Sequence, residues 1–209
     1  QHVWENMSSK KLYITGGIGS RPQGEGFGPN YELSNHTGYC ETCASISNVY
    51  WNHRMFLATG ESKYYDIVER ALFNGVMSGV SLSGDRFFYD NPLQSLGEHD
   101  RAEWFGCACC PPNLARLISS IGEYCFTENE ERFYIHQFVG CKLKSDKAEI
   151  EIASTYTENG KLTIKINPVR SFELAVRIPE WCNNYSFSVD CKVKDGYAHF
   201  TVDGETHID

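Results

Sequence analysis

The pattern of apolar residues changes once along the 209-residue chain, and this change constrains the fold most strongly. Before the acidic run at 128–131, apolar residues recur at helical spacing near 42–58, 61–77 and 112–126. From Arg132 onward, short segments alternate apolar and polar residues, which is typical of antiparallel strands packed on a core. The sequence therefore predicts an α+β chain with helices first and strands second. Residues 80–93, within the helical part, have the pattern of a hairpin.

The run WFGCACCPPN places three cysteines, Cys107, Cys109 and Cys110, directly before two prolines. Proline cannot continue a strand or sit inside a helix, so we expect a turn here, followed by the helix near 112–126. Free N–H groups and the dipole at a helix start favour thiolate over thiol. Adjacent cysteines rarely form a disulfide with each other, whereas adjacent thiolates can share a metal ion.

A second candidate set of ligands lies in the run GYCETCAS, which contains Cys40, Glu41 and Cys43. This run also precedes a helical pattern, and two thiolate-rich helix starts can close one four-ligand site. Zinc suits thiolates with one carboxylate in a tetrahedral arrangement. The spacing is not that of a standard zinc finger, and it leaves open which cysteines bind. The alternative is that these cysteines are small buried hydrophobic residues.

A glycine-rich loop over residues 12–39 precedes this second set, and long ordered loops tend to be functional. Its glycines do not have the G-x-G-x-x-G order of a dinucleotide site. Glu25 stands between two glycines, and a carboxyl group on such a loop could enter a cleft and act as an acid or base. From these residues alone, a solvated loop glutamate is the favoured interpretation.

Composition excludes several classes of partner. The net charge of −8 argues against nucleic acid as the main partner. No apolar run approaches the ~20 residues that span a membrane. The nine cysteines are clustered rather than spread as in a disulfide scaffold, so we expect a reducing compartment. No signal peptide is visible and the chain opens on Gln1, so we expect a cytoplasmic protein that is processed or a fragment.

Five segments together resemble glycoside hydrolase family 127, the β-L-arabinofuranosidases, and the related family 146. They are YITGGIGS, GEGF, NHTGYCETCAS, LFNGV and WFGCACCPPNLARLI. The likeness covers nearly the whole chain up to Trp181-Cys182. It implies an (α/α)6 barrel followed by β-sandwich domains. We therefore expect part of the catalytic barrel over residues 1–130 and a β-sandwich, itself cut short, over residues 131–209.

The resemblance also implies a site. It assigns one Zn²⁺ to one glutamate and three cysteines: Glu41, Cys43, Cys109 and Cys110. It makes Cys109 the nucleophile and Glu25 the acid/base, and it places Tyr89 near the sugar. Cys40 and Cys107 share the motifs but are not ligands in this interpretation.

The implied activity is zinc-dependent, retaining release of L-arabinofuranose from β-L-arabinofuranosides in a glycan or glycopeptide. A complete barrel needs about twelve helices and the sequence predicts three or four, so we expect the chain alone to be a weak or inactive catalyst. One alternative is a structural zinc module whose cysteines only hold helices together. Another is thiol chemistry without sugars, such as zinc-thiolate alkyl transfer. The histidines, including His99 and His136, are expected to be structural.

Overall fold

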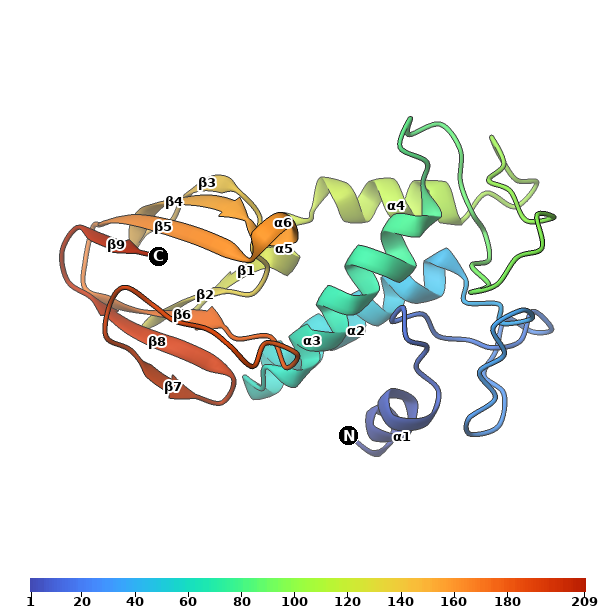
Figure 1. The fold of residues 1–209 in the computed structure, drawn as a ribbon, viewed down its shortest axis with the longest axis horizontal. Helices are drawn as coiled ribbons and strands as arrows, with labels where there is room; N and C mark the ends of the chain where they lie inside the picture. Colours follow the sequence, from blue (N-terminus) through green and yellow to red (C-terminus); the bar gives the residue numbers. More distant parts are fainter. The chain divides into compact units, whose positions relative to one another are not determined.

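The computed structural model describes residues 1–209, and the chain divides into two compact units. The first unit comprises Gln1–Gly60 and Tyr64–Ser120, and the second comprises Glu61–Lys63 and Ile121–Asp209. The long helices lie in the first unit and all nine strands lie in the second (Figure 1). The predicted mixed α and β fold with antiparallel strands is confirmed. None of the helices combines the length and apolar character that crossing a bilayer requires.

The helical unit contains α1 (His2–Lys10), α2 (Thr42–Thr59), α3 (Lys63–Arg70) and α4 (Cys110–Ser119). α2 ends at Gly60, whose φ of 74° gives a left-handed cap that few other residues adopt without strain. α3 continues as a π-helix, η1 (Ala71–Val76), and a short 3-10 turn, η2 (Met77–Gly79). The segment predicted as one helix at 61–77 is therefore three successive helical forms, a change that apolar spacing does not reveal.

The glycine-rich loop is fixed against this π-helix. The N–H of Gly75 donates to the carbonyl of Thr15 at 3.2 Å, and the Asn48 amide donates to the carbonyl of Gly16 at 3.0 Å. Gly16 has a φ of 79°, and a Cβ there would come within 2.5 Å of the Ala71 nitrogen. Only glycine fits this close approach. The loop is thereby anchored on buried helices, and the residues that follow it reach the start of α2.

α4 begins earlier than predicted and ends sooner. Cys110 is its first residue, and Pro111 and Pro112 occupy its first turn, where a missing N–H costs little. The helix ends at Ser119, and a four-residue helix, α5 (Gly122–Cys125), follows before the first strand. The helix predicted near 112–126 is confirmed in position, but it is divided into two helices. Glycine at 122 weakens helix propensity at this break.

The hairpin predicted over residues 80–93 is shorter in the structure: residues 80–87 form an antiparallel turn, and residues 88–93 do not pair back on it. The N–H of Ser81 donates to the carbonyl of Arg86 at 2.8 Å, and Val80 and Phe87 form one isolated antiparallel bridge. Phe87 pairs on its other side with Ala102. The segment after Phe87 therefore leaves the turn and is free to pack elsewhere in the unit.

The second unit consists of two sheets. The five-stranded sheet has the order β1-β2-β6-β8-β7 and the four-stranded sheet the order β3-β4-β5-β9. The strands are β1 (Phe126–Glu128), β2 (Arg132–Ile135), β3 (Cys141–Lys144), β4 (Ala148–Thr155), β5 (Lys161–Pro168), β6 (Phe172–Arg177), β7 (Lys192–Lys194), β8 (Tyr197–Val202) and β9 (Thr206–Ile208). A short helix, α6 (Tyr156–Asn159), joins β4 to β5. All pairs are antiparallel except β2 with β6, which run parallel.

One apolar core joins the two sheets. Ile150 and Ile164 of the four-stranded sheet and Leu174 and Phe200 of the five-stranded sheet belong to the same buried cluster. Along β4, buried and exposed residues alternate over the first six positions, as the sequence pattern predicts. A register shift of one residue would turn this apolar face to water, so the core specifies the strand pairing.

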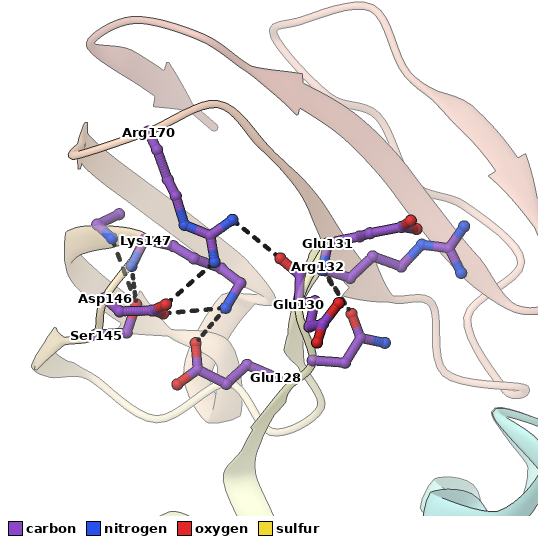
Figure 2. A network of polar contacts seen from close by, with 10 residues as sticks. Glu128, Glu130, Glu131, Arg132, Ser145, Asp146, Lys147 and Arg170 are labelled. Carbon is purple, nitrogen blue, oxygen red and sulfur yellow. Dashed lines mark hydrogen bonds and ion pairs between the residues drawn. The ribbon is translucent and has the colours of Figure 1, made fainter.

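A charged network holds one edge of this unit (Figure 2). The side chain of Lys147 is only 3% exposed, and its Nζ lies 3.1 Å from Glu128 Oε2 and 3.1 Å from Asp146 Oδ1. Arg170 donates to Asp146 Oδ2 at 3.1 Å and to the carbonyl of Glu130 at 3.0 Å. Two cations thus meet two carboxylates. The network connects the end of β1, the β3–β4 turn and the β5–β6 turn.

Candidate metal centre and active site

Four side chains of the first unit converge on one point: Glu41, Cys43, Cys109 and Cys110. One ligand atom from each lies within 4.8 Å of all the others. The sulfurs of Cys109 and Cys110 are 3.7 Å apart, and Glu41 Oε1 lies 3.4 Å from the first and 3.5 Å from the second. The structure therefore brings together the four residues that the family resemblance assigned to the metal, and this group can hold a metal ion.

Two helix starts supply these groups. Glu41 caps α2 and Cys43 lies in its first turn, while Cys109 caps α4 and Cys110 is its first residue. The two helices pack against each other. Free N–H groups and the positive ends of two helix dipoles favour negative charge at this position. The sequence argument that two thiolate-rich helix starts can meet is confirmed.

The thiols cannot all ionise without a cation. A hydrogen bond from Cys110 lowers the pKa of Cys43 to about 7, and the same interaction raises the pKa of Cys110. Burial raises the pKa of Cys109 to about 11. One thiolate beside the Glu41 carboxylate therefore suppresses the ionisation of its neighbours. A bound cation would reverse this preference, because it stabilises every thiolate it touches.

Tyr89 is placed beside the cluster by hydrogen bonds to the start of α2. The N–H of Thr42 donates to the carbonyl of Tyr89 at 2.8 Å. The Asn91 amide donates to the carbonyl of Cys40 at 3.1 Å and to Thr42 Oγ1 at 3.0 Å. These contacts bring the Tyr89 hydroxyl to 3.1 Å from Cys109 Sγ. A segment that leaves the turn at 80–87 thus ends against the thiols.

Glu25 reaches the same phenol from the glycine-rich loop. Arg21 and Gly26 exchange two backbone hydrogen bonds of 3.1 Å, which close a tight turn. Within the turn Glu25 has a φ of 48°, an uncommon conformation for a residue other than glycine. Glu25 Oε1 accepts a hydrogen bond from the Tyr89 hydroxyl at 3.3 Å. Strained residues of this kind cluster at functional sites.

The two distances through Tyr89 limit the separation of the nucleophile and acid/base candidates. Cys109 Sγ and Glu25 Oε1 lie 3.1 and 3.3 Å from one phenol oxygen, so they are no more than 6.4 Å apart. A hydrogen bond with Cys109, and after it burial, raises the pKa of Tyr89. The Tyr89 hydroxyl therefore stays protonated and available as a donor at neutral pH.

Sequence reasoning missed Tyr39. Its hydroxyl donates to Glu25 Oε1 at 3.1 Å, and its ring lies 6.3 Å from the ring of Tyr89. The only signal in the sequence is its place directly before the Cys40-Glu41 pair. Nothing in local spacing indicates that this tyrosine faces a glutamate fourteen residues earlier.

The remaining candidates lie outside the cluster. Cys40 is buried with a φ of 42° and faces the glycine-rich loop, and Cys107 is exposed. His99 stacks on Phe88 and its Nε2 is 2.9 Å from a backbone carbonyl. His136 is buried in the second unit and bonds two hydroxyls at 2.7 and 2.9 Å. Both histidines have structural partners, as expected.

Comparison with known proteins identifies the family of this chain. Residues 1–123 match the profile described as beta-L-arabinofuranosidase, GH127 catalytic domain, and residues 132–206 match the GH127 middle domain. The two profiles together cover nearly the whole chain. The chain belongs to the GH127 β-L-arabinofuranosidase family.

Individual relatives agree with this assignment. A non-reducing end β-L-arabinofuranosidase of Bifidobacterium longum subsp. longum is 32% identical over 99% of this chain and 35% of its own length. A solved GH127 β-arabinofuranosidase has a TM-score of 0.89 at 41% identity, covering 98% of this chain and 37% of its own. A solved GH127 β-L-arabinofuranosidase of Geobacillus stearothermophilus T6 has a TM-score of 0.87 at 38% identity. The match covers 98% of this chain and 36% of that enzyme. The chain spans little more than a third of each relative.

Proposed function

We propose that this chain carries the catalytic centre of a zinc-dependent, retaining glycoside hydrolase that releases L-arabinofuranose from β-L-arabinofuranosides. One observation carries the proposal. A continuous line of contacts runs from the metal-binding group through Cys109 Sγ and the Tyr89 hydroxyl to the Glu25 carboxylate. A thiol of the metal-binding group and a carboxyl group therefore contact the same phenol. The activity of the related enzymes, release of β-L-arabinofuranose, indicates the sugar.

The donor set fits zinc. Zn–S bonds of ~2.3 Å and Zn–O bonds of ~2.0 Å in a tetrahedron require sulfurs ~3.75 Å apart and sulfur–oxygen separations of ~3.5 Å. The corresponding separations here are 3.7 Å between Cys109 and Cys110, and 3.4 and 3.5 Å from these sulfurs to Glu41. Thiolates select zinc over magnesium or calcium. Glu41, Cys43, Cys109 and Cys110 would hold the ion.

Zinc held by these residues would supply the charge that keeps Cys109 a thiolate near neutral pH. Cys109 then attacks the anomeric carbon while Glu25 protonates the leaving oxygen. In the second half of the reaction Glu25 takes a proton from water, and that water cleaves the bond between sugar and sulfur. Two displacements retain the configuration of the sugar. Tyr89 contacts both reacting residues and would orient the sugar between them.

The spacing of the two groups supports retention. Carboxylate pairs stand ~5–5.5 Å apart in retaining glycosidases and ~6.5–9.5 Å apart in inverting enzymes, which need room for a water. The limit of 6.4 Å between Cys109 Sγ and Glu25 Oε1 lies below the inverting range. This spacing is compatible with a nucleophile that attacks the sugar directly.

We propose the architecture that goes with this activity. Residues 1–130 would form part of an (α/α)6 barrel and residues 131–209 a β-sandwich. The limits of the two profile matches, 1–123 and 132–206, support this division. Since the chain spans 35% of its Bifidobacterium relative, we expect weak or no turnover from these 209 residues alone.

Glu25→Gln tests the function in the parent protein, by which we mean the longest natural protein that carries this chain. We expect hydrolysis of an aryl β-L-arabinofuranoside to fall by ~10²–10⁴-fold, because Gln cannot transfer the proton, with zinc content unchanged. The matched control is Glu158→Gln in α6, an exposed residue of the second unit. A parent that binds zinc but hydrolyses no furanoside would instead favour a structural zinc module. A fully active Glu25→Gln variant would remove Glu25 from the mechanism.

A further inference from the structure

We infer that Tyr39 is the positioning residue that holds Glu25 Oε1, so that Oε2 is the oxygen that gives and takes the catalytic proton. This inference rests on the proposed function and names a residue that the function does not yet include. Both phenols near Glu25 bond the same oxygen, Tyr39 at 3.1 Å and Tyr89 at 3.3 Å. An oxygen that already accepts two hydrogen bonds is poorly placed to carry a proton, which leaves Oε2 for that role.

Tyr39 and Tyr89 are not equivalent donors. Tyr89 donates its one hydroxyl proton to Glu25 Oε1 at 3.3 Å, and its oxygen accepts from the thiol of Cys109 at 3.1 Å. Once Cys109 is a thiolate, it competes for that proton as a charged acceptor. Each time Tyr89 turns to the sulfur, Glu25 loses one of its two donors. Tyr39 then remains as the donor to Oε1.

The backbone of Tyr39 is hydrogen-bonded to two segments, the loop that carries Glu25 and the segment that carries Tyr89. Its N–H donates to the carbonyl of Ser20 at 3.3 Å, in the loop that leads into the Glu25 turn. Its carbonyl accepts from the N–H of Asn91 at 2.9 Å, just after Tyr89. The next residue, Cys40, donates to the carbonyl of Gly19 at 2.8 Å. Backbone hydrogen bonds thus hold Tyr39 against both the glycine-rich loop and the segment after Tyr89.

Glu25 needs such a contact. It stands at the tip of an exposed turn, and a glutamate side chain that stays free keeps up to ~2 kcal/mol of rotamer entropy. A catalytic acid that samples several rotamers spends little time at the leaving oxygen, and small misplacements cost up to ~10²-fold in rate. A donor on a fixed backbone removes that freedom at one oxygen and leaves the other free to react.

Tyr39→Phe in the zinc-loaded parent protein tests the inference, with two aryl β-L-arabinofuranosides as substrates. One carries a poor leaving group that needs protonation, and the other carries an activated nitrophenolate that does not. We expect kcat/KM to fall ~10–100-fold for the first substrate and less than ~3-fold for the second, because only the acid is misplaced. Zinc content should stay at the wild-type value. Tyr31→Phe, an exposed tyrosine of the same loop, is the matched control.

The possible outcomes distinguish a failure of this inference from a failure of the proposed glycosidase function. An active parent whose Tyr39→Phe variant keeps its full rate on both substrates overturns the positioning role alone. Equal losses on both substrates, or loss of zinc, would make Tyr39 structural and overturn it as well. A parent that hydrolyses neither substrate removes the proposed function, and the inference falls with it.

Discussion

Two polar clusters, one in each unit, differ in their charge balance. The network around Lys147 in the second unit joins Lys147 and Arg170 to Glu128 and Asp146, so its charges cancel. The cluster at Glu41 in the first unit gathers a carboxylate and three thiols and includes no basic side chain. Both clusters tie together segments far apart in the sequence, but only the Glu41 cluster lacks a cation.

This difference separates a structural cluster from a metal-binding one. Proteins rarely bury groups of one sign without compensation, because an unpaired buried charge is costly. The Lys147 network meets that requirement with its own side chains. The Glu41 cluster meets it in part with two helix starts and with thiols that stay protonated, and a divalent cation would complete it.

Removing zinc should have the largest effect, and only on the Glu41 cluster. With free zinc at ~1,000 times its Kd, binding stabilises the site by about 4 kcal/mol. A strong chelator should therefore speed hydrogen exchange at the starts of α2 and α4 and leave the amides of β4 unchanged. Zinc should restore protection and Mg²⁺ should not, since thiolates discriminate against magnesium. Equal loss of protection in β4 would contradict the comparison.

Lys147→Met should have a smaller effect, confined to the second unit. The nearly buried ammonium bonds two carboxylates, but those carboxylates are 40% and 67% exposed and can be resolvated. We expect a loss of roughly 1–2 kcal/mol in stability, measured from hydrogen exchange in β4, and no change in zinc content. Lys192→Met on the exposed strand β7 is the control and should stay within about 0.5 kcal/mol. Loss of zinc from Lys147→Met would show that the clusters are coupled.

The smallest expected effect is on the stability of the protein at low pH, when Asp146 is replaced by Asn. Lys147 and then Arg170 hold the pKa of Asp146 below its ordinary value. A group whose pKa is lower in the folded state adds stability above its unfolded pKa of ~3.9, and that stability is lost as pH falls through the folded pKa. Asp146→Asn should therefore flatten the fall in stability below about pH 4, and the exposed control Asp203→Asn should not. Identical acid unfolding curves for both variants would remove Asp146 from the network.

Much of the fold followed from the sequence because its signals are local. The change from helical spacing to alternation predicted helices before strands, and the prolines after Cys110 marked a helix start. The π-helix at Ala71–Val76 and the parallel pairing of β2 with β6 were not predicted, because both depend on contacts between distant segments.

The site was harder to predict for the same reason. Motif spacing could not distinguish the cluster residues from Cys40 and Cys107, and the family resemblance made that choice. In the structure the side chain of Cys40 lies against Gly17 and is not part of the cluster, a placement that no pattern of residue types records. Tyr39 was missed because its partner, Glu25, lies across a folded loop.

Zinc stoichiometry by native mass spectrometry tests the central claim most directly. We compare the wild-type chain with Cys110→Ala, which removes a buried member of the cluster, and with Cys107→Ala, which removes an exposed cysteine of the same motif. The charge argument predicts one zinc per chain in the wild type and in Cys107→Ala, and none in Cys110→Ala. A wild-type chain without zinc, or a Cys110→Ala chain that keeps it, would contradict the claim that these four residues form a zinc site.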